Sequence, residues 1–199
     1  MVNLENKTAK GIQTQRHIMN VAIELFKNQG YDNVSVDRIV KESKTSKGSF
    51  YQHFPSKSSI FMMRFMELDE NYIKIHNELK SQYSTAKERL EAFCYSVFRC
   101  IEEEMGKELM RVIYSAAIIS NDHTFFTNEE RKLYIILREI IEDGKKDNSI
   151  RNIESTHIFY KILVQSIFGV IYFWGLQLNN DRLENLGKPL IQQLISSLR

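Results

Sequence analysis

The sequence predicts an all-α protein. Only two prolines and eight glycines occur among its 199 residues, and apolar residues recur three and four positions apart along most of the chain. No segment shows a persuasive strand-like alternation of apolar and polar residues. With 43% hydrophobic residues, the chain can form a small domain and a larger one with its own core. We expect about nine helices, divided between a domain of residues 1–56 and a domain of residues 57–199.

The first three predicted helices form a helix-turn-helix arrangement. The first covers residues 8–29, and its apolar stripe consists of Ile12, Ile18, Val21, Ala22, Leu25 and Phe26. The second runs from about residue 36 to 43 behind an N-cap at Ser35, and the third runs to Phe54 behind an N-cap at Ser46. The segment 43–46 between them favours a tight turn, because its side chains compete for backbone hydrogen bonds.

The third helix concentrates polar and aromatic side chains on its outer faces. Phe50 and Phe54 lie four residues apart and can pack inward. The outer faces are left to Lys47, Gly48, Ser49, Tyr51 and His53. A glycine lets the backbone approach a base closely, a lysine supplies charge, serine and histidine can bond phosphate oxygens, and a tyrosine offers a ring and a hydroxyl. This chemistry is that of a helix that reads DNA.

Six further helices are predicted in the larger domain. They cover roughly residues 57–83, 86–106, 108–120, 127–143 and 155–179, with a last helix that carries Leu190, Ile191, Leu194, Ile195 and Leu198. Residues 120–123 read as a loop, and the segment 144–148 ends the helix before it.

The helix from Ser155 to Asn179 is apolar nearly all round between Ile162 and Leu178, so it must be covered on several sides. A membrane span is one alternative, but the stretch is marginally short and contains Gln165 and Ser166. We therefore expect this helix to face the domain interior on one side and a second subunit on the other.

The stretch from Asn33 to Phe61 resembles the DNA-binding domain of the TetR/AcrR family of bacterial transcriptional regulators. Four motifs carry the resemblance: Asp37-x-Ile39-Val40, Ser46-Lys47-Gly48, Tyr51-x-His53-Phe54 and Pro55-Ser56-Lys57. One position departs from the family pattern, because the turn residue is usually glycine and is Lys44 here. Lys44 must either take a left-handed conformation at some cost or alter the turn.

The resemblance implies a ligand-responsive, sequence-specific regulator that binds a palindromic operator in double-stranded DNA as a homodimer and is released by a largely apolar small molecule. Family habit favours a repressor, although the sequence does not exclude an activator. By resemblance, Gly48 and Tyr51 contact base edges, and the residues that position the phosphate backbone are Ser35, Thr45, Ser46, Lys47, Ser49, His53 and Lys57. Three of these residues have alternative roles: Ser35 as a cap only, Lys57 as a solvated charge, and Tyr51 as a packed ring.

The charge distribution agrees with this assignment. Residues 1–57 contain nine Lys or Arg against five Asp or Glu, and the rest of the chain contains eighteen against twenty. A basic N-terminal domain suits an electrostatic grip on phosphates, although such an excess alone is also an ordinary solvated surface.

For the larger domain we predict a ligand site and a dimer interface, with ordinary core packing as the alternative at each position. The ligand candidates are aromatic and aliphatic residues with a few polar anchors, namely Tyr72, Phe93, Val97, Phe98, Arg111, Ile113, Tyr114, Ala117, Phe159, Leu163 and Gln165. An inward-facing Arg111 would favour an anionic group on the ligand. The dimer candidates come from the last two helices and are Ile167, Val170, Ile171, Trp174, Leu190, Ile191, Leu194 and Leu198.

Other classes of protein are disfavoured. The chain has no phosphate loop, nucleophile elbow or triad arrangement, so we expect neither catalysis nor a cofactor. Five scattered histidines and the pair Cys94 and Cys100 lack metal-ligand spacing, so no metal site is expected. The polar segment Met1–Gly11 has no signal-peptide character, which predicts a cytoplasmic protein. A nonspecific DNA-organising protein and a regulator without a small-molecule effector remain as alternatives.

Overall fold

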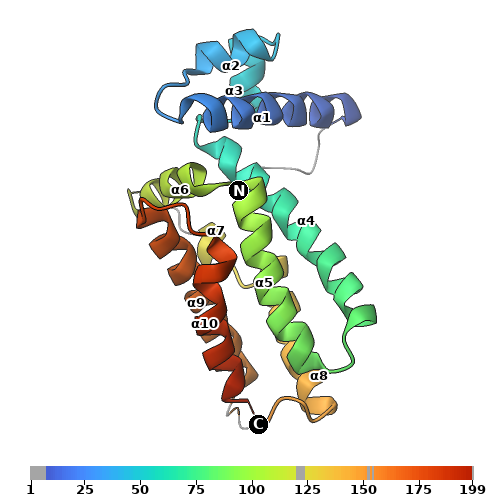
Figure 1. Ribbon diagram of the computed structural model, residues 1–199. Helices are drawn as coiled ribbons and strands as arrows, with labels where there is room; N and C mark the ends of the chain where they lie inside the picture. Colours follow the sequence, from blue (N-terminus) through green and yellow to red (C-terminus); the bar gives the residue numbers. More distant parts are fainter. Residues whose placement is uncertain (1–7, 120–123, 152, 154, 199) are drawn as a thin grey trace. The chain divides into compact units, whose positions relative to one another are not determined.

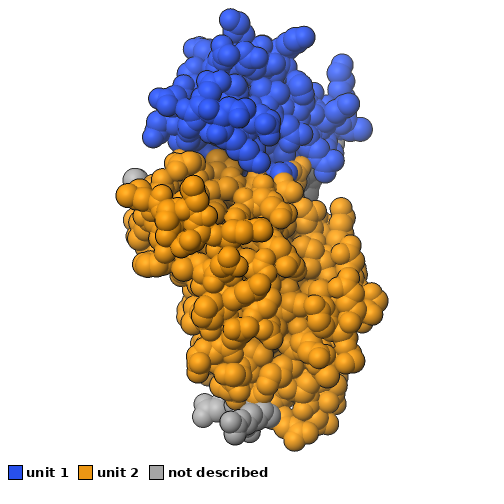
Figure 2. All heavy atoms as spheres, viewed as in Figure 1, with its two compact units in different colours: residues 1–65 blue, residues 66–199 orange. Residues whose placement is uncertain are grey.

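The computed structural model describes residues 8–119, 124–151, 153 and 155–198. These residues contain helices and no strand, as the sequence predicts. The chain divides into two compact units, residues 1–65 and residues 66–199 (Figure 2). The division falls within a long helix, α4 (Ser59–Gln82), whereas the sequence led us to place it at residue 56. The start of α4 belongs to the first unit because Phe61 packs on Phe26 and Tyr31, with ring centroids 5.4 and 5.2 Å apart.

Unit 1 (residues 1–65) contains α1 (Ala9–Gln29), α2 (Val36–Glu42) and α3 (Lys47–His53) (Figure 1). Each begins at a hydroxyl cap: Thr8, Ser35 and Ser46 accept hydrogen bonds from backbone N–H groups in the first turns. The core of the unit is formed by fully buried apolar side chains, including Ile18, Met19, Ala22, Phe26, Ile39, Phe50 and Phe54. These side chains fix the three short helices to one another.

Unit 2 (residues 66–199) is a helical bundle. Beyond α4 it contains α5 (Ala86–Glu104), α6 (Lys107–Ile119), a single turn α7 (Thr124–Thr127), α8 (Lys132–Lys146), α9 (Thr156–Leu176) and α10 (Leu183–Ser196). Helix α5 packs on both α8 and α10, and α9 packs on α6, α8 and α10 (Figure 1). With α7 counted, the described residues form ten helices where the sequence predicts about nine.

Two local features explain how the bundle is fixed. Helix α5 begins with a capping box between Thr85 and Glu88, and the Asp147 carboxylate accepts a further hydrogen bond from the Ala86 N–H at 2.8 Å. Helix α8 begins at Lys132 and not at the predicted Thr127. The delay has a tertiary cause, because the Arg131 side chain before it forms a buried, bidentate ion pair with Asp69 of α4.

Among the described residues, α9 alone has the length and composition of a membrane span. Half of its most apolar window is buried by the other helices, which is the behaviour of a core helix in a bundle. The sequence predicts that α9 is covered on two sides, and helices of its own protomer cover one of them.

Candidate functional site

Helix α3 presents its N-terminal half to solvent. Phe50 and Phe54 point inward and are fully buried, as the four-residue spacing predicts. Tyr51 is 53% exposed, with its ring edge-on to Phe50 at a centroid distance of 5.3 Å. Lys47 and Gly48 are exposed one turn before it. A Cβ at Gly48 would meet only the Ser46 hydroxyl oxygen, at 3.8 Å, so the fold does not require this glycine.

The turn between α2 and α3 is built around a left-handed residue. Lys44 has a φ of 51°, the left-handed alternative that the sequence leaves open for it. Beside it, the Ser43 and Thr45 hydroxyl oxygens lie 2.8 Å apart, and a ring nitrogen of His17 lies 3.1 Å from the Ser43 carbonyl oxygen. These contacts hold the turn from both sides and account for how a residue other than glycine is tolerated there.

One exposed ion pair links the two helices of the motif. The Lys47 ammonium lies 2.6 Å from a carboxylate oxygen of Asp37, and that contact raises the pKa of Lys47 above its usual value. Both side chains are largely solvent-exposed, so the pair contributes little to stability and can exchange for a phosphate.

Lys57 does not have a free charge to offer to DNA. Its ammonium donates hydrogen bonds to the carbonyl oxygens of Tyr31 and Val34, at 2.7 and 2.8 Å, and lies 3.8 Å from the centre of the Tyr31 ring. Burial lowers the pKa of Lys57. Both the predicted phosphate contact and the alternative of a solvated charge therefore need correction: Lys57 ties the start of α4 to the segment after α1.

His53 also differs from its predicted place on the outer face. It is only 8% exposed, and its carbonyl accepts a hydrogen bond from the buried Gln15 amide at 3.5 Å. Ser35 and Ser46 use their hydroxyl oxygens as helix caps, with 3.1 Å bonds from the Arg38 and Ser49 N–H groups. The exposed DNA-binding candidates that have no such structural task are concentrated at Lys47, Gly48 and Tyr51.

In unit 2, most of the predicted ligand-lining residues are packed core. The buried members of that set are Tyr72, Phe93, Val97, Phe98, Ile113, Phe159 and Leu163. The Tyr72 and Phe93 rings meet edge to face at 6.1 Å, and Phe98 packs so closely on Gly187 that a Cβ there would lie 2.2 Å from the Phe98 ring. Gln165 is exposed, so it cannot anchor a ligand in the interior. Helical periodicity identifies inward residues and cannot separate a filled core from a cavity.

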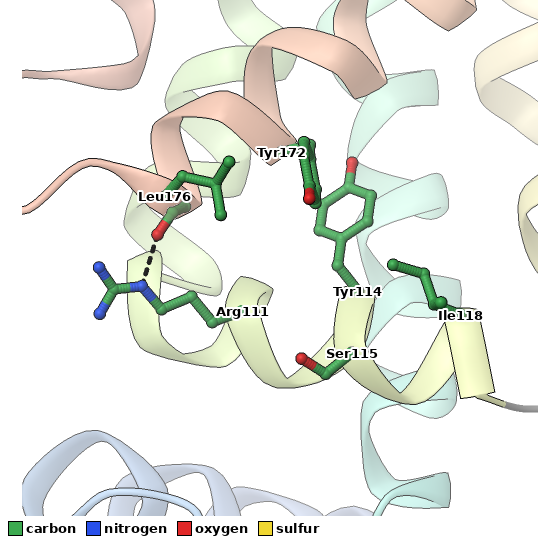
Figure 3. Close-up of a pocket in the computed structure, with 7 residues that line it drawn as sticks. Arg111, Tyr114, Ser115, Ile118, Tyr172 and Leu176 are labelled. Atoms are coloured by element: carbon green, nitrogen blue, oxygen red, sulfur yellow. Dashed lines mark hydrogen bonds between the residues drawn. The ribbon is translucent and has the colours of Figure 1, made fainter.

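A groove of about 430 Å³ does exist between α6 and α9. It is lined by Arg111, Tyr114, Ser115 and Ile118 from α6 and by Tyr172, Gly175 and Leu176 from α9 (Figure 3). Only Arg111 and Tyr114 belong to the predicted ligand set; Ala117 lies on the same helix and is half-buried. The α9 members were missed because their exposure depends on how α9 is rotated in the bundle.

An aromatic cluster forms one side of this groove. The Tyr114 ring lies edge to face with Tyr172 at 5.6 Å and stacks on Phe126 at 5.7 Å. The Tyr114 hydroxyl donates a hydrogen bond to the Phe168 carbonyl at 3.0 Å, and burial raises the pKa of that hydroxyl. Tyr114 is therefore fixed, whereas Tyr172 is exposed.

Arg111 bounds the other side. Its Nε donates to the Gly175 carbonyl, one Nη donates to the Gln177 carbonyl at 3.1 Å, and the other lies 2.7 Å from a Glu108 carboxylate oxygen. Arg111 thus caps the C-terminal end of α9, where unpaired carbonyls carry partial negative charge. It does not face the interior of the bundle, which removes the inward-facing geometry considered from the sequence.

The predicted dimer residues are mostly inside the protomer. Six of them are buried by its own helices: Ile167, Val170, Ile171, Trp174, Ile191 and Leu198. They cannot supply an outer face, and only Leu190 and the half-buried Leu194 remain available. The exposed apolar residues of α9 lie on the opposite side and are Ile158, Ile162, Tyr172, Phe173 and Leu176. We call this row the α9 stripe.

No group of three or more His, Cys, Asp or Glu side chains that could hold a metal occurs within the described part of the chain. Cys94 is buried in α5, and burial raises the pKa of its thiol to about 12. A reactive thiolate at Cys94 is therefore not supported.

Comparison with known proteins agrees with the geometry of unit 1. The family described as "Bacterial regulatory proteins, tetR family" matches residues 18–62. The HTH-type transcriptional regulator QacR of Staphylococcus aureus is 26% identical over 174 residues, which cover 86% of this chain and 91% of QacR. AcrR of Shigella flexneri is 26% identical over 140 residues, covering 67% of this chain and 63% of AcrR. The match thus spans less than two thirds of AcrR.

Solved structures extend the likeness to the whole fold. The crystal structure of the transcriptional regulator FadR from Bacillus subtilis in complex with stearoyl-CoA aligns over 92% of this chain and 99% of its own, with a TM-score of 0.71. Its sequence identity is 18%, so this likeness shows a shared fold and no more. Together with the helix-turn-helix geometry of unit 1, these findings confirm the resemblance seen in the sequence: residues 18–62 match the tetR family of bacterial regulatory proteins, and the chain is similar to transcriptional regulators of that family in sequence and in fold.

Proposed function

We propose that the protein is a cytoplasmic repressor that binds a palindromic operator as a homodimer and leaves it when a small molecule binds unit 2. The observation that carries the proposal is the exposed face of α3. Two buried phenylalanines hold this helix in place, while the side chains of Lys47 and Tyr51 are exposed to solvent and the fold does not require a glycine at Gly48. An aromatic ring with a hydroxyl suits contact with a base edge and a thymine methyl, and lysine suits a phosphate.

The short length of α3 is the reason to propose a dimer. Helix α3 has seven residues and can contact only a few base pairs, so a specific site requires a second copy about 34 Å along the duplex. The α9 stripe supports a twofold contact, because exposed apolar side chains at positions 158, 162, 172, 173 and 176 recur along one side of the helix.

The response to a small molecule is proposed on two grounds. FadR, which shares the fold, is a regulator solved with stearoyl-CoA, and unit 2 has its own groove. Helix α4 runs without a break from unit 1 into unit 2, so a change in the bundle has a covalent route to the DNA-binding unit. A coupling of about 1 to 3 kcal/mol would change operator affinity roughly 5- to 150-fold.

Salt-dependent binding to a mixed-sequence duplex tests DNA binding itself. We expect affinity to fall steeply with salt and Lys47→Glu to weaken binding strongly, since a charge that faces phosphate is reversed. Lys145→Glu is the matched control, because Lys145 is an exposed lysine of α8 in unit 2 that also pairs with a carboxylate. Equal losses in the two variants would show that α3 is not the contact surface.

A further inference from the structure

The groove between α6 and α9 has two chemically different ends. Figure 3 shows the rings of Tyr114 and Tyr172 close together, with the Arg111 side chain extending away from them along the other end. The exposed Ser115 lies on the α6 side between these ends, and the exposed Leu176 lies on the α9 side. An amphipathic molecule would match this order, with a ring at one end and a polar group at the other.

Arg111 retains hydrogen-bonding capacity in this position. A guanidinium has five N–H donors, and three of them are used by the Gly175 carbonyl, the Gln177 carbonyl and Glu108. The Arg111 side chain is 34% exposed and its partner Glu108 is 71% exposed. The ion pair between them is thus a surface pair that contributes little and can be replaced by another anion.

We propose that this groove is a binding site for a small aromatic anion, whose ring packs against Tyr114 and Tyr172 and whose carboxylate, sulfonate or phosphate is held by Arg111. The site deepens the proposed function by naming the chemical class of the effector, and to that extent it rests on that function. A volume of about 430 Å³ accommodates one or two fused rings with a charged group. The anion takes the place of Glu108 and shares Arg111 with the carbonyls that end α9.

The position of the site ties it to both α6 and the α9 stripe. Tyr172 and Leu176 line the groove and also belong to the stripe. Lys107, one turn before Arg111, donates to the Gln177 and Asn179 carbonyls at 3.4 and 2.6 Å. A ligand that draws on Arg111 therefore alters how α6 holds the end of α9, next to the surface proposed for the second copy.

Calorimetric titration of the full chain with naphthalene-2-sulfonate and with the uncharged 2-naphthol tests the inference. We expect the sulfonate to bind about ten-fold or more tightly than the naphthol, because charge-assisted hydrogen bonds to a guanidinium are strong. Arg111→Met should remove this preference and Ser115→Phe should block both probes by filling the groove. Glu108→Gln should strengthen sulfonate binding and leaves Arg111 in place, so it remains informative if loss of the α9 cap unfolds the Arg111 variant.

Arg151→Met is the matched control, because Arg151 also donates to a backbone carbonyl, that of Asn148, but lies before the start of α9 and outside the groove. It should bind the sulfonate like the unaltered protein. Equal affinity for the two probes, sulfonate binding that survives Ser115→Phe, or a groove closed to both probes by a second copy would overturn the inference. Sulfonate binding without any change in affinity for DNA would leave the site standing and remove the effector response from the proposed function.

Discussion

At the scale of single residues, Lys44 has a strained left-handed backbone conformation. Its φ of 51° is unfavourable for a side chain with a Cβ, by about 1 to 2 kcal/mol. Glycine would relieve this strain but would lose about 0.5 to 1 kcal/mol through the greater freedom of the unfolded chain. The difference favours glycine.

We therefore predict that Lys44→Gly raises the free energy of unfolding of unit 1 by about 0.5 to 1 kcal/mol. Asn148→Gly is the comparison, because Asn148 has a φ of 59° but asparagine tolerates this conformation, so little gain is expected. Urea unfolding followed by far-ultraviolet circular dichroism measures the change, with the fluorescence of Trp174, the sole tryptophan, reporting unit 2 separately. A loss of stability in Lys44→Gly would contradict the strain argument.

We expect Lys57 and Lys47 to have different roles: Lys57 stabilises the fold, and Lys47 contacts DNA. Lys57→Ala removes two hydrogen bonds that a charged ammonium donates to the Tyr31 and Val34 carbonyls. We therefore expect the free energy of unfolding to fall by about 2 kcal/mol and the salt dependence of DNA affinity to stay unchanged. Lys47→Ala should leave stability nearly unchanged and lower the salt slope of DNA binding by about one. The two measurements are denaturant unfolding and DNA affinity over a series of salt concentrations. The reverse pattern would restore Lys57 to the phosphate contacts.

Tyr51 carries the prediction on specificity. Tyr51→Ala should weaken binding to the preferred operator by about 1 to 3 kcal/mol and should change binding to unrelated DNA much less. Its exposure and edge contact with Phe50 indicate that the ring contributes little to the core. Competition between operator and scrambled duplexes measures both affinities, and equal losses on the two would argue against a base contact.

The sequence could predict the residues whose tasks are local. The caps at Ser35 and Ser46 and the inward Phe50 and Phe54 follow from spacing within one or two turns. The resemblance places Lys57 on the phosphate backbone, whereas its partners in the structure are the carbonyls of Tyr31 and Val34, more than twenty positions earlier in the chain. No local sequence pattern predicts a contact over that distance along the chain.

At the scale of helices, α9 shows where periodicity fails. Because α9 is apolar nearly all round, its sequence does not show how the helix is rotated about its axis. The sequence therefore predicts one face toward the domain interior and one toward a second subunit, without showing which residues form each face. Gly169 and Gln165, both exposed, mark the outer face once the structure is known. The groove was missed for a related reason, since it depends on the packing of α6 against the C-terminal end of α9.

The contact of α4 with α8 predicts a dependence of stability on pH. His76 is buried, neither of its ring nitrogens has a hydrogen-bond partner among the described residues, and one lies 3.6 Å from a Glu139 carboxylate oxygen. Burial lowers the pKa of His76, with Lys80 and Arg89 acting in the same direction and Glu139 and Asp143 opposing them.

Because the folded-state pKa lies below the unfolded value of 6.5, His76 favours the fold when neutral. The stabilising contribution of neutral His76 is fully present above pH 6.5 and is lost as the pH falls from 6.5 through the folded-state pKa. We predict that unit 2 is less stable at pH 5.5 than at pH 7.5 and that His76→Phe reduces this difference by up to the equivalent of one proton. Urea unfolding monitored at Trp174 measures it, and an unchanged pH dependence in the variant would refute the assignment to His76.

At the scale of the whole molecule, the proposed dimer depends on the α9 stripe. Phe173 is 55% exposed, so Phe173→Asp should leave the protomer folded while placing a charge in the proposed interface. We expect a monomer by light scattering and a large loss of operator affinity. Tyr83→Asp is the control, since Tyr83 is also exposed but lies outside the stripe, at the end of α4. A dimer that persists in Phe173→Asp would place the interface elsewhere.

The proposal at the scale of the whole molecule is that α3, in a dimer, reads a specific DNA sequence. It is tested most directly by selection from a randomised duplex pool at near-physiological salt, with the bound fraction sequenced for the unaltered protein and for Tyr51→Ala side by side. We predict one enriched inverted repeat, with half-sites about one helical turn apart, and its weakening in the variant. A purified dimer that enriches no motif would contradict sequence-specific reading by α3 and indicate binding to DNA by charge and shape alone.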